Sequence, residues 1–252
     1  MTNGSGGGAA SHAGETGKSL KDQNRWQLWI MVAANSLFLC GVVQANAIRA
    51  DGLRAAFTDA QNLASVGVAL VVATVLNGLV SADMKARLVF LRWQHALPGY
   101  CAFTKYAVRD PRIDVAVLEK LHGGALPVDP IAQNRAWYRL YKTVENDQAV
   151  RQVHRDFLLL RDYTALSALF LALYGAAGLY AIPSLKVGFV YLLLLVGQYA
   201  IARQSASNYG IRMVTTVLAR RAAKDGVEPP KIPRKRVNRK LKSDASETPQ
   251  ST

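Results

Sequence analysis

The sequence predicts an all-helical integral membrane protein, with four transmembrane helices arranged as two hairpins and a cytoplasmic helical subdomain inserted between them. Two observations lead to this fold class. The chain of 252 residues contains four long apolar runs without a charged residue, and nearly all of its positive charge lies on one side of those runs. Half of the residues are hydrophobic, which supplies the apolar surface that membrane helices need.

The four runs are long enough to cross a hydrocarbon layer about 30 Å thick, because a helix rises about 1.5 Å per residue. We place the spans at residues 26–48, 60–82, 163–182 and 187–203. A short turn containing Pro183 joins the last two, so they form one hairpin. The loop between the first two is also short, and these spans are therefore expected to be antiparallel neighbours.

Lysine and arginine are distributed asymmetrically about the spans. Of the 31 basic residues, 28 lie in residues 1–25, 83–162 and 203–252. The two loops on the other side carry only Arg49, Arg54 and Lys186. The positive-inside rule therefore predicts a bacterial inner-membrane protein with both termini on the cytoplasmic side. Helices buried in a soluble bundle can also be apolar all round, but the charge pattern favours a multi-pass membrane protein.

The polar segments differ in their expected order. Residues 1–25 contain a glycine-rich tract and few large apolar side chains, which predicts disorder. Residues 204–226 form a predicted juxtamembrane helix, and residues 227–252 a basic disordered tail.

The block 83–162 contains helix signals of its own. Residues 83–97 are expected to prolong the second span out of the membrane. Asp110-Pro111 and Asp129-Pro130 each have the form of an N-cap followed by proline at the first helical position. Asn146 is the expected cap of the helix that leads into the third span. The block is therefore predicted to be a small helical subdomain against one face of the membrane.

The net charge of +14 indicates a negatively charged partner. Two sets of basic residues are candidate contacts for such a partner. One set follows one face of a predicted helix and consists of Arg135, Arg139 and Lys142. The other forms a cluster in the tail and consists of Lys231, Arg234, Lys235, Arg236, Arg239, Lys240 and Lys242. They can form a solvated surface or contact anionic lipid head groups. The tail cluster contains no aromatic residue on which bases could stack, so nucleic acid is the less favoured partner.

No residue pattern predicts catalysis, a cofactor or a metal site. Gly17-Lys18-Ser19 resembles the end of a phosphate-binding loop, but the first glycine of that motif is replaced by His12. His154-Arg155-Asp156 copies three letters of a kinase catalytic loop inside an uninterrupted helical pattern. Cys40 and Cys101 show neither disulfide nor metal-ligand spacing.

Uncharged polar residues within the predicted spans are the remaining candidate site. They are Asn35, Gln44, Asn77 and Gln198. Such side chains seek hydrogen-bond partners inside the membrane, either within one bundle, across an oligomer interface or along a water-filled path.

Two hairpins around a cytoplasmic helical block resemble the small four-span bacterial membrane proteins that act as pore-forming effectors in antiphage systems. The segments 98–103 and 110–114 are similar to a stretch of uncharacterised proteobacterial membrane proteins. The first resemblance implies an oligomeric pore or effector without catalytic activity, and neither implies a functional residue. Two alternatives stay open, namely a membrane anchor that recruits a cytoplasmic protein partner and a small-solute transporter.

Overall fold

The computed structural model describes residues 25–45, 68, 71–72 and 75–226, and the regular structure within them is entirely helical. The helices are α2 (Arg25–Val43), α6 (Ala82–Phe90), α7 (Val115–His122), α8 (Pro130–Val144), α9 (Gln148–Ala181) and α10 (Leu185–Gly226), with the short turns η1 (Pro98–Cys101), η2 (Ala102–Tyr106) and η3 (Ala107–Arg109). The prediction of an all-helical protein is confirmed.

Three of these helices, α2, α9 and α10, are long and apolar enough to cross a membrane. They correspond to the predicted first, third and fourth spans. Most of the predicted second span, 60–82, lies outside the described residues, as do residues 1–24 and the tail 227–252. Four spans and their arrangement as two hairpins therefore stay a prediction.

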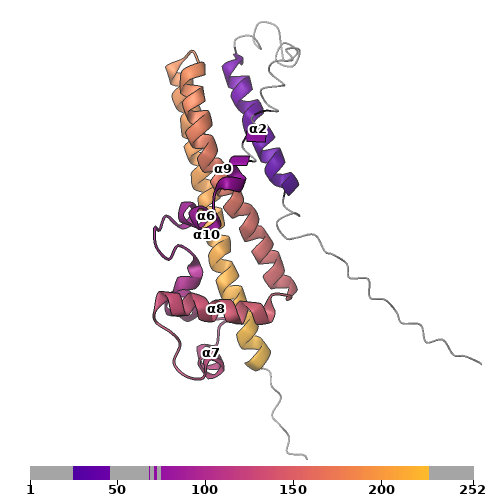
Figure 1. Ribbon diagram of the computed structural model, residues 1–252, viewed down its shortest axis with the longest axis vertical. Helices are drawn as coiled ribbons and strands as arrows, with labels where there is room; N and C mark the ends of the chain where they lie inside the picture. Colours follow the sequence, from indigo (N-terminus) through magenta and orange to yellow (C-terminus); the bar gives the residue numbers. More distant parts are fainter. Residues whose placement is uncertain (1–24, 46–67, 69–70, 73–74, 227–252) are drawn as a thin grey trace, which may run out of the picture.

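The antiparallel pair α9 and α10 is the longest feature of the molecule (Figure 1). With 34 and 42 residues, the two helices measure about 51 and 63 Å, well beyond the thickness of a hydrocarbon layer. The predicted spans 163–182 and 187–203 are therefore parts of longer helices. In particular, the span 187–203 and the expected juxtamembrane helix 204–226 form one continuous helix.

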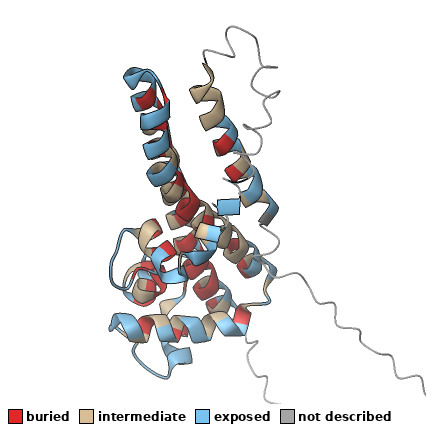
Figure 2. Cartoon of the chain, turned by 45° about the horizontal axis from the view of Figure 1, so that its top comes forward, coloured by how far each residue is buried: buried red, intermediate tan, exposed pale blue. Residues whose placement is uncertain are grey.

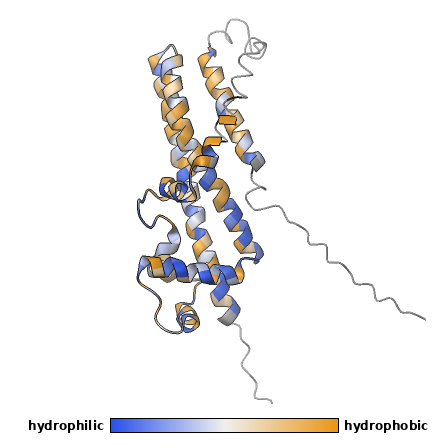
Figure 3. Cartoon of the chain, in the orientation of Figure 1, coloured by the Kyte–Doolittle hydropathy of each residue, from blue (hydrophilic) through white to orange (hydrophobic). Residues whose placement is uncertain are grey.

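Hydropathy divides this hairpin into two halves. The end near the turn between α9 and α10 is hydrophobic, as is much of α2, whereas the opposite end is largely hydrophilic (Figure 3). In the apolar half, α2 packs against α9 through a cluster that includes Val32, Leu166 and Phe170, with Tyr191 and Leu195 contributed by α10. This half is the membrane-compatible part of the protein.

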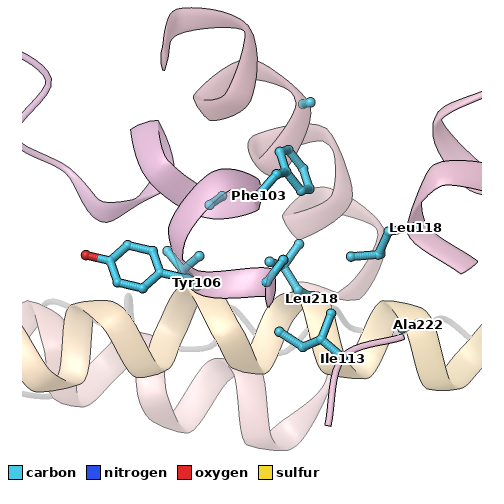
Figure 4. Close-up of a cluster of buried hydrophobic side chains, with 10 residues drawn as sticks. Phe103, Tyr106, Ile113, Leu118, Leu218 and Ala222 are labelled. Carbon is cyan, nitrogen blue, oxygen red and sulfur yellow. The ribbon is translucent and has the colours of Figure 1, made fainter. Parts of the chain in front are cut away.

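In the polar half, a second core forms on the far end of α10. Figure 4 shows Phe103 and Tyr106 from η2, Ile113, and Leu118 from α7 gathered near Leu218 and Ala222 of α10. Buried residues continue along the hairpin from one half into the other (Figure 2). The subdomain is therefore built directly on α10 and is not a separate domain on a linker.

Local capping explains several helix boundaries. Asp129 caps α8 as predicted, because its carboxylate accepts a hydrogen bond from the backbone N–H of Ala132, and Pro130 occupies the first helical position. The cap of α9 is Asp147 and not the predicted Asn146. The Asp147 carboxylate accepts from the N–H groups of Ala149 and Val150, where its charge also suits the helix dipole.

Three further boundaries differ from the predictions. The helix expected to start at Asp110-Pro111 starts at Val115, because Asp114 provides the cap while Asp110 binds Arg112. Residues 83–97 do not prolong the second span, because Ser81 is extended and its side chain caps a new helix, α6. The helix expected to reach residue 97 ends at Phe90, because Leu91 adopts a left-handed conformation with φ of 50°.

Gly210 permits α6, α9 and α10 to approach closely. A Cβ atom placed on Gly210 would lie 2.8 Å from Cζ of Phe90 on α6 and 2.9 Å from Cε2 of Phe157 on α9. A Cβ atom placed on Gly197, in the same helix, would meet nothing within 4 Å. The two glycines therefore form a matched pair for measuring this contact.

We expect Gly210→Ala to lower the midpoint of thermal unfolding in detergent micelles. Overpacking at a buried contact destabilises the folded protein by about 1–3 kcal/mol. Replacing glycine by alanine inside a helix stabilises that helix by up to about 1 kcal/mol, which offsets only part of this cost. Gly197→Ala, the control, should leave the midpoint unchanged or raise it. Equal behaviour of the two variants would show that the three helices can separate at Gly210 without cost.

His154 of α9 contributes a titratable group to the packing of α8 against α9. Its ring meets the ring of Tyr141 edge-on with centroids 5.6 Å apart, and its Nδ1 lies 3.1 Å from the Tyr141 hydroxyl oxygen. Burial lowers the pKa of His154 below its usual 6.5, and the positive charge of Arg161 lowers it further.

Stability should therefore fall as the pH drops below about 6.5, because the unfolded chain takes up a proton on this imidazole while the folded protein resists doing so. Thermal unfolding measured between pH 7.5 and 5.5 checks this expectation. In His154→Gln that part of the pH dependence should disappear, whereas substitution of the exposed His122 by Gln should preserve it. A pH profile identical in His154→Gln and the unaltered chain would contradict the expectation.

Candidate functional site

The most distinctive polar site lies where the apolar and polar halves of the protein meet. Lys85 of α6 and Asp162 of α9 form an ion pair, with 3.2 Å between Nζ and Oδ1. Their side chains are only 4% and 3% exposed. The same Asp162 oxygen accepts hydrogen bonds from Nε and Nη2 of Arg161, at 3.1 and 3.0 Å. We call Lys85, Arg161 and Asp162 the junction cluster.

The junction cluster fastens α6 to α9. Removing a charge from water costs several kcal/mol, so a buried charge is retained only where an opposite charge and hydrogen bonds compensate for it. The Asp162 carboxylate meets two cations, one from each side of the contact. Sliding of α6 along α9 would separate Lys85 from Asp162 and lose their attraction inside a buried contact. The cluster therefore fixes where α6 sits on α9.

Two neutral hydrogen bonds support the same junction. The Tyr199 hydroxyl on α10 donates to the backbone carbonyl oxygen of Leu88 at 2.9 Å. Leu88 belongs to the last turn of α6, where carbonyl groups lack partners within the helix. One residue earlier on α10, Nε2 of Gln198 donates to the Tyr163 hydroxyl oxygen of α9 at 2.7 Å. α6, α9 and α10 are thus joined by polar contacts at one level.

The four predicted intramembrane polar residues have different environments. Gln198 bonds to a neighbouring helix, as described above, whereas Nδ2 of Asn35 donates to the carbonyl oxygen of Met31 in its own helix. Gln44 is half-buried just beyond the end of α2. Oδ1 of Asn77 is buried and has no hydrogen-bond partner in the described part of the chain. Of the four, Gln198 alone is joined by its side chain to another described helix.

The link between α2 and α9 uses residues that were not predicted. The Ser36 hydroxyl lies 2.7 Å from the Tyr174 hydroxyl, and Ser36 also donates to the Val32 carbonyl oxygen. Nothing local in the sequence indicates that Ser36 faces Tyr174, because the two residues lie 138 positions apart in the chain. The contact satisfies two hydroxyl groups inside the apolar half.

The predicted basic face of α8 lies far along the polar half. Arg135 and Arg139 are exposed, and Nζ of Lys142 pairs with Oε2 of Glu145 at 2.8 Å. The helix packs near Val217 of α10, about 21 Å along that helix from Arg203 at 1.5 Å per residue. Lipid contact by this face stays a prediction, and the seven basic residues of the tail lie outside the described residues.

Gln133 is a structural residue that sequence reasoning missed. It is 2% exposed, and its Oε1 accepts hydrogen bonds from the backbone N–H groups of Phe103 and Thr104 and from the Thr104 hydroxyl. Its Nε2 donates to the Val128 carbonyl oxygen at 2.7 Å. A single glutamine thereby fastens η2 to α8, and an isolated glutamine in a polar helix carries no sequence signal for this role.

Within the described ranges, no group of His, Cys, Asp and Glu side chains is arranged to hold a metal ion. Cys40 and Cys101 are free and half-buried. In the junction cluster, one carboxylate meets two cations inside a buried contact, an arrangement that suits electrostatic fastening.

We expect Asp162→Asn to be severely destabilising, by about 3–5 kcal/mol, because it removes the buried carboxylate that Lys85 and Arg161 both contact. Lys85→Met should cost less, since Asp162 keeps Arg161 as a partner. Unfolding in detergent micelles, followed by circular dichroism, measures both changes.

The matched control is the exposed ion pair between Asp83 and Arg87, also on α6. Because surface pairs contribute at most about 1 kcal/mol, Asp83→Asn should have a small effect. If Asp162→Asn proved as mild as Asp83→Asn, the junction cluster would not be what fastens α6.

No protein-family model, curated protein or solved structure matches this chain.

Proposed function

We propose that this protein is a non-enzymatic membrane scaffold that presents a helical subdomain to a protein partner on one side of a bacterial inner membrane. The observation that carries the proposal is the continuity of α9 and α10, which run without a break from the apolar half into the polar half. A subdomain built on such helices is held at a set distance and orientation. A scaffold needs this property, because its partner must meet the subdomain in a defined position.

The outer surface of the hairpin suits lipid contact. On α10, large apolar side chains are exposed in the segment that would cross the membrane, including Phe189, Leu193 and Ile201. Near the junction, Trp93 is 78% exposed beside Arg87, whose guanidinium carbon lies 5.9 Å from the ring centroid. Tryptophan and arginine are characteristic of the membrane–water interface. These features support a membrane boundary near the junction cluster.

The outward face of α8 supports the recruitment of a protein partner. Ile131 and Tyr138 are 53% and 51% exposed, and Arg135 lies between them on the same face at helical spacing. Val128, just before α8, is 75% exposed. Exposed aromatic, aliphatic and arginine side chains together are typical of the centre of a protein–protein interface. We call Val128, Ile131, Arg135 and Tyr138 the α8 face.

Orientation follows from the charge distribution. Because 28 of the 31 basic residues lie in the two terminal segments and the central block, the proposal places the subdomain and both termini in the cytoplasm.

A second candidate function is an oligomeric pore. The observation that favours it is the buried Oδ1 of Asn77, which has no hydrogen-bond partner among the described residues. An intramembrane carbonyl oxygen in this state can accept a hydrogen bond across an oligomer interface or from water in a channel. The other polar contacts of the apolar half favour the scaffold, because Gln198 and Ser36 are satisfied within one chain.

The two functions make opposite predictions for the full chain reconstituted in dye-loaded vesicles. A scaffold should leave the vesicles sealed, because anchoring a subdomain requires no water-filled path through the membrane. Dye release by the unaltered chain, abolished by Asn77→Leu, would favour the pore instead.

For the scaffold, a photo-crosslinking amino acid placed at Tyr138 in cells should form an adduct with a discrete protein. The same probe at Leu193, exposed on the apolar half of α10, is the control and should not form that adduct. Ile131→Ser should weaken the Tyr138 adduct without changing the amount of protein in the membrane. Failure of Tyr138 to crosslink any protein would contradict the recruitment role.

A further inference from the structure

A basic cleft lies between the η2–η3 segment and α10, away from the α8 face. Its volume is about 760 Å³, and it is formed by residues 105–112 on one side and residues 208–215 on the other. Four cationic side chains line it, Lys105, Arg109, Arg112 and Arg212. The single acid in the lining is Asp110.

Asp110 is already neutralised by Arg112. Its two carboxylate oxygens accept hydrogen bonds from Nε and Nη2 of Arg112, at 2.9 and 2.6 Å, and the backbone N–H of Arg112 adds a third. This contact with Arg112 lowers the pKa of Asp110 to about 2, so the carboxylate is ionised at neutral pH and its charge is matched by the guanidinium. Asp110 therefore compensates for one of the four cations.

Three positive charges remain in excess. Among the described residues, no carboxylate forms an ion pair with Lys105, Arg109 or Arg212. Like charges held around one cleft repel one another, and an anion bound between them relieves that repulsion. The cleft is therefore matched to a ligand with more than one negative charge.

The rest of the lining supplies neutral hydrogen-bonding groups and an apolar wall. Asn208 and Thr215 carry an amide and a hydroxyl, and Ile211 lies between them along α10. Tyr106 is held by the subdomain core, while its ring extends away from the other labelled side chains (Figure 4). Nζ of Lys105 lies 5.6 Å from the centre of that ring. The lining thus combines four cations with apolar groups that pack on the subdomain core.

The position of the cleft favours access from water. At 1.5 Å per residue, Asn208 to Thr215 lie about 8 to 18 Å along α10 beyond Arg203, the end of the predicted span. The head-group layer on each side of a bilayer is only about 5–8 Å thick. The cleft therefore faces the aqueous side, at or beyond the outer edge of the head groups.

We propose that this cleft binds the phosphate groups of a multiply charged phosphorylated anion. Arginine forks match phosphate oxygens, and lysine adds a further charge-assisted hydrogen bond. A soluble phosphate compound is the source favoured by the depth of the cleft, and an anionic lipid head group would offer the same chemistry. The inference does not depend on the scaffold role, because it concerns another surface of the subdomain.

The test uses the full chain in phosphatidylcholine nanodiscs, titrated with pyrophosphate in a calorimeter. We expect saturable binding that weakens with salt. Arg109→Gln combined with Arg212→Gln should weaken binding at least tenfold, because two charge-assisted hydrogen bonds to the anion are lost. Both arginines are exposed, so the double variant should fold normally.

The control removes the same charge elsewhere, by Arg135→Gln combined with Arg139→Gln on α8. Binding unchanged in this control supports the cleft, whereas an equal loss in both double variants would overturn it in favour of non-specific attraction. A parallel arm measures binding of the detergent-solubilised chain to phosphatidylcholine vesicles with and without phosphatidylglycerol. If the chain binds phosphatidylglycerol vesicles but not pyrophosphate, and the Arg109 and Arg212 substitutions weaken that binding, the ligand is a lipid head group. If the chain binds neither pyrophosphate nor these vesicles, the proposal is overturned.

Discussion

The packing of α9 against α10 is the constraint on which the rest of the structure depends. Every other described helix packs on this pair: α2 on its apolar half, α6 at the junction, and α7 and α8 on the polar end of α10. Close contact is possible because Gly178 and Gly210 lack side chains where Tyr191 and the rings of Phe90 and Phe157 pass. This pair of helices thus fixes where the subdomain lies relative to the apolar half of the protein.

Charged side chains have different environments at the junction cluster, in the basic cleft and on α8. At the junction, Lys85 and Asp162 are buried and matched, so they fasten two helices and offer nothing to a ligand. In the basic cleft, Arg109 and Arg212 are exposed and unmatched by carboxylates of the described chain, so they are free to meet an anion. On α8, Arg135 lies between exposed apolar side chains, which suits a protein surface. Burial and pairing thus separate structural charges from those available for binding.

Predictions from the sequence succeeded where the cause is local. Asp129-Pro130 starts α8, because a cap and the proline after it act within one helical turn. The prediction of a helix start at Asp110-Pro111 was wrong, because the Asp110 carboxylate binds Arg112 and Ile113 packs in the core on α10. The end of α6 was also wrong, because no glycine or proline marks the left-handed Leu91. The environments of Asn35 and Gln198 could not be predicted, because they depend on which helix lies opposite.

The sequence by itself determined that the chain is helical and that three of its described helices are long and apolar enough to cross a membrane. Those properties follow from the length of apolar runs and from caps, which act over a few residues. Only the tertiary structure decided that Lys85 meets Asp162 and that residues 105–112 face residues 208–215 across a cleft. These partners are far apart in the chain, and their contact depends on how helix faces pack rather than on any spacing that a sequence displays.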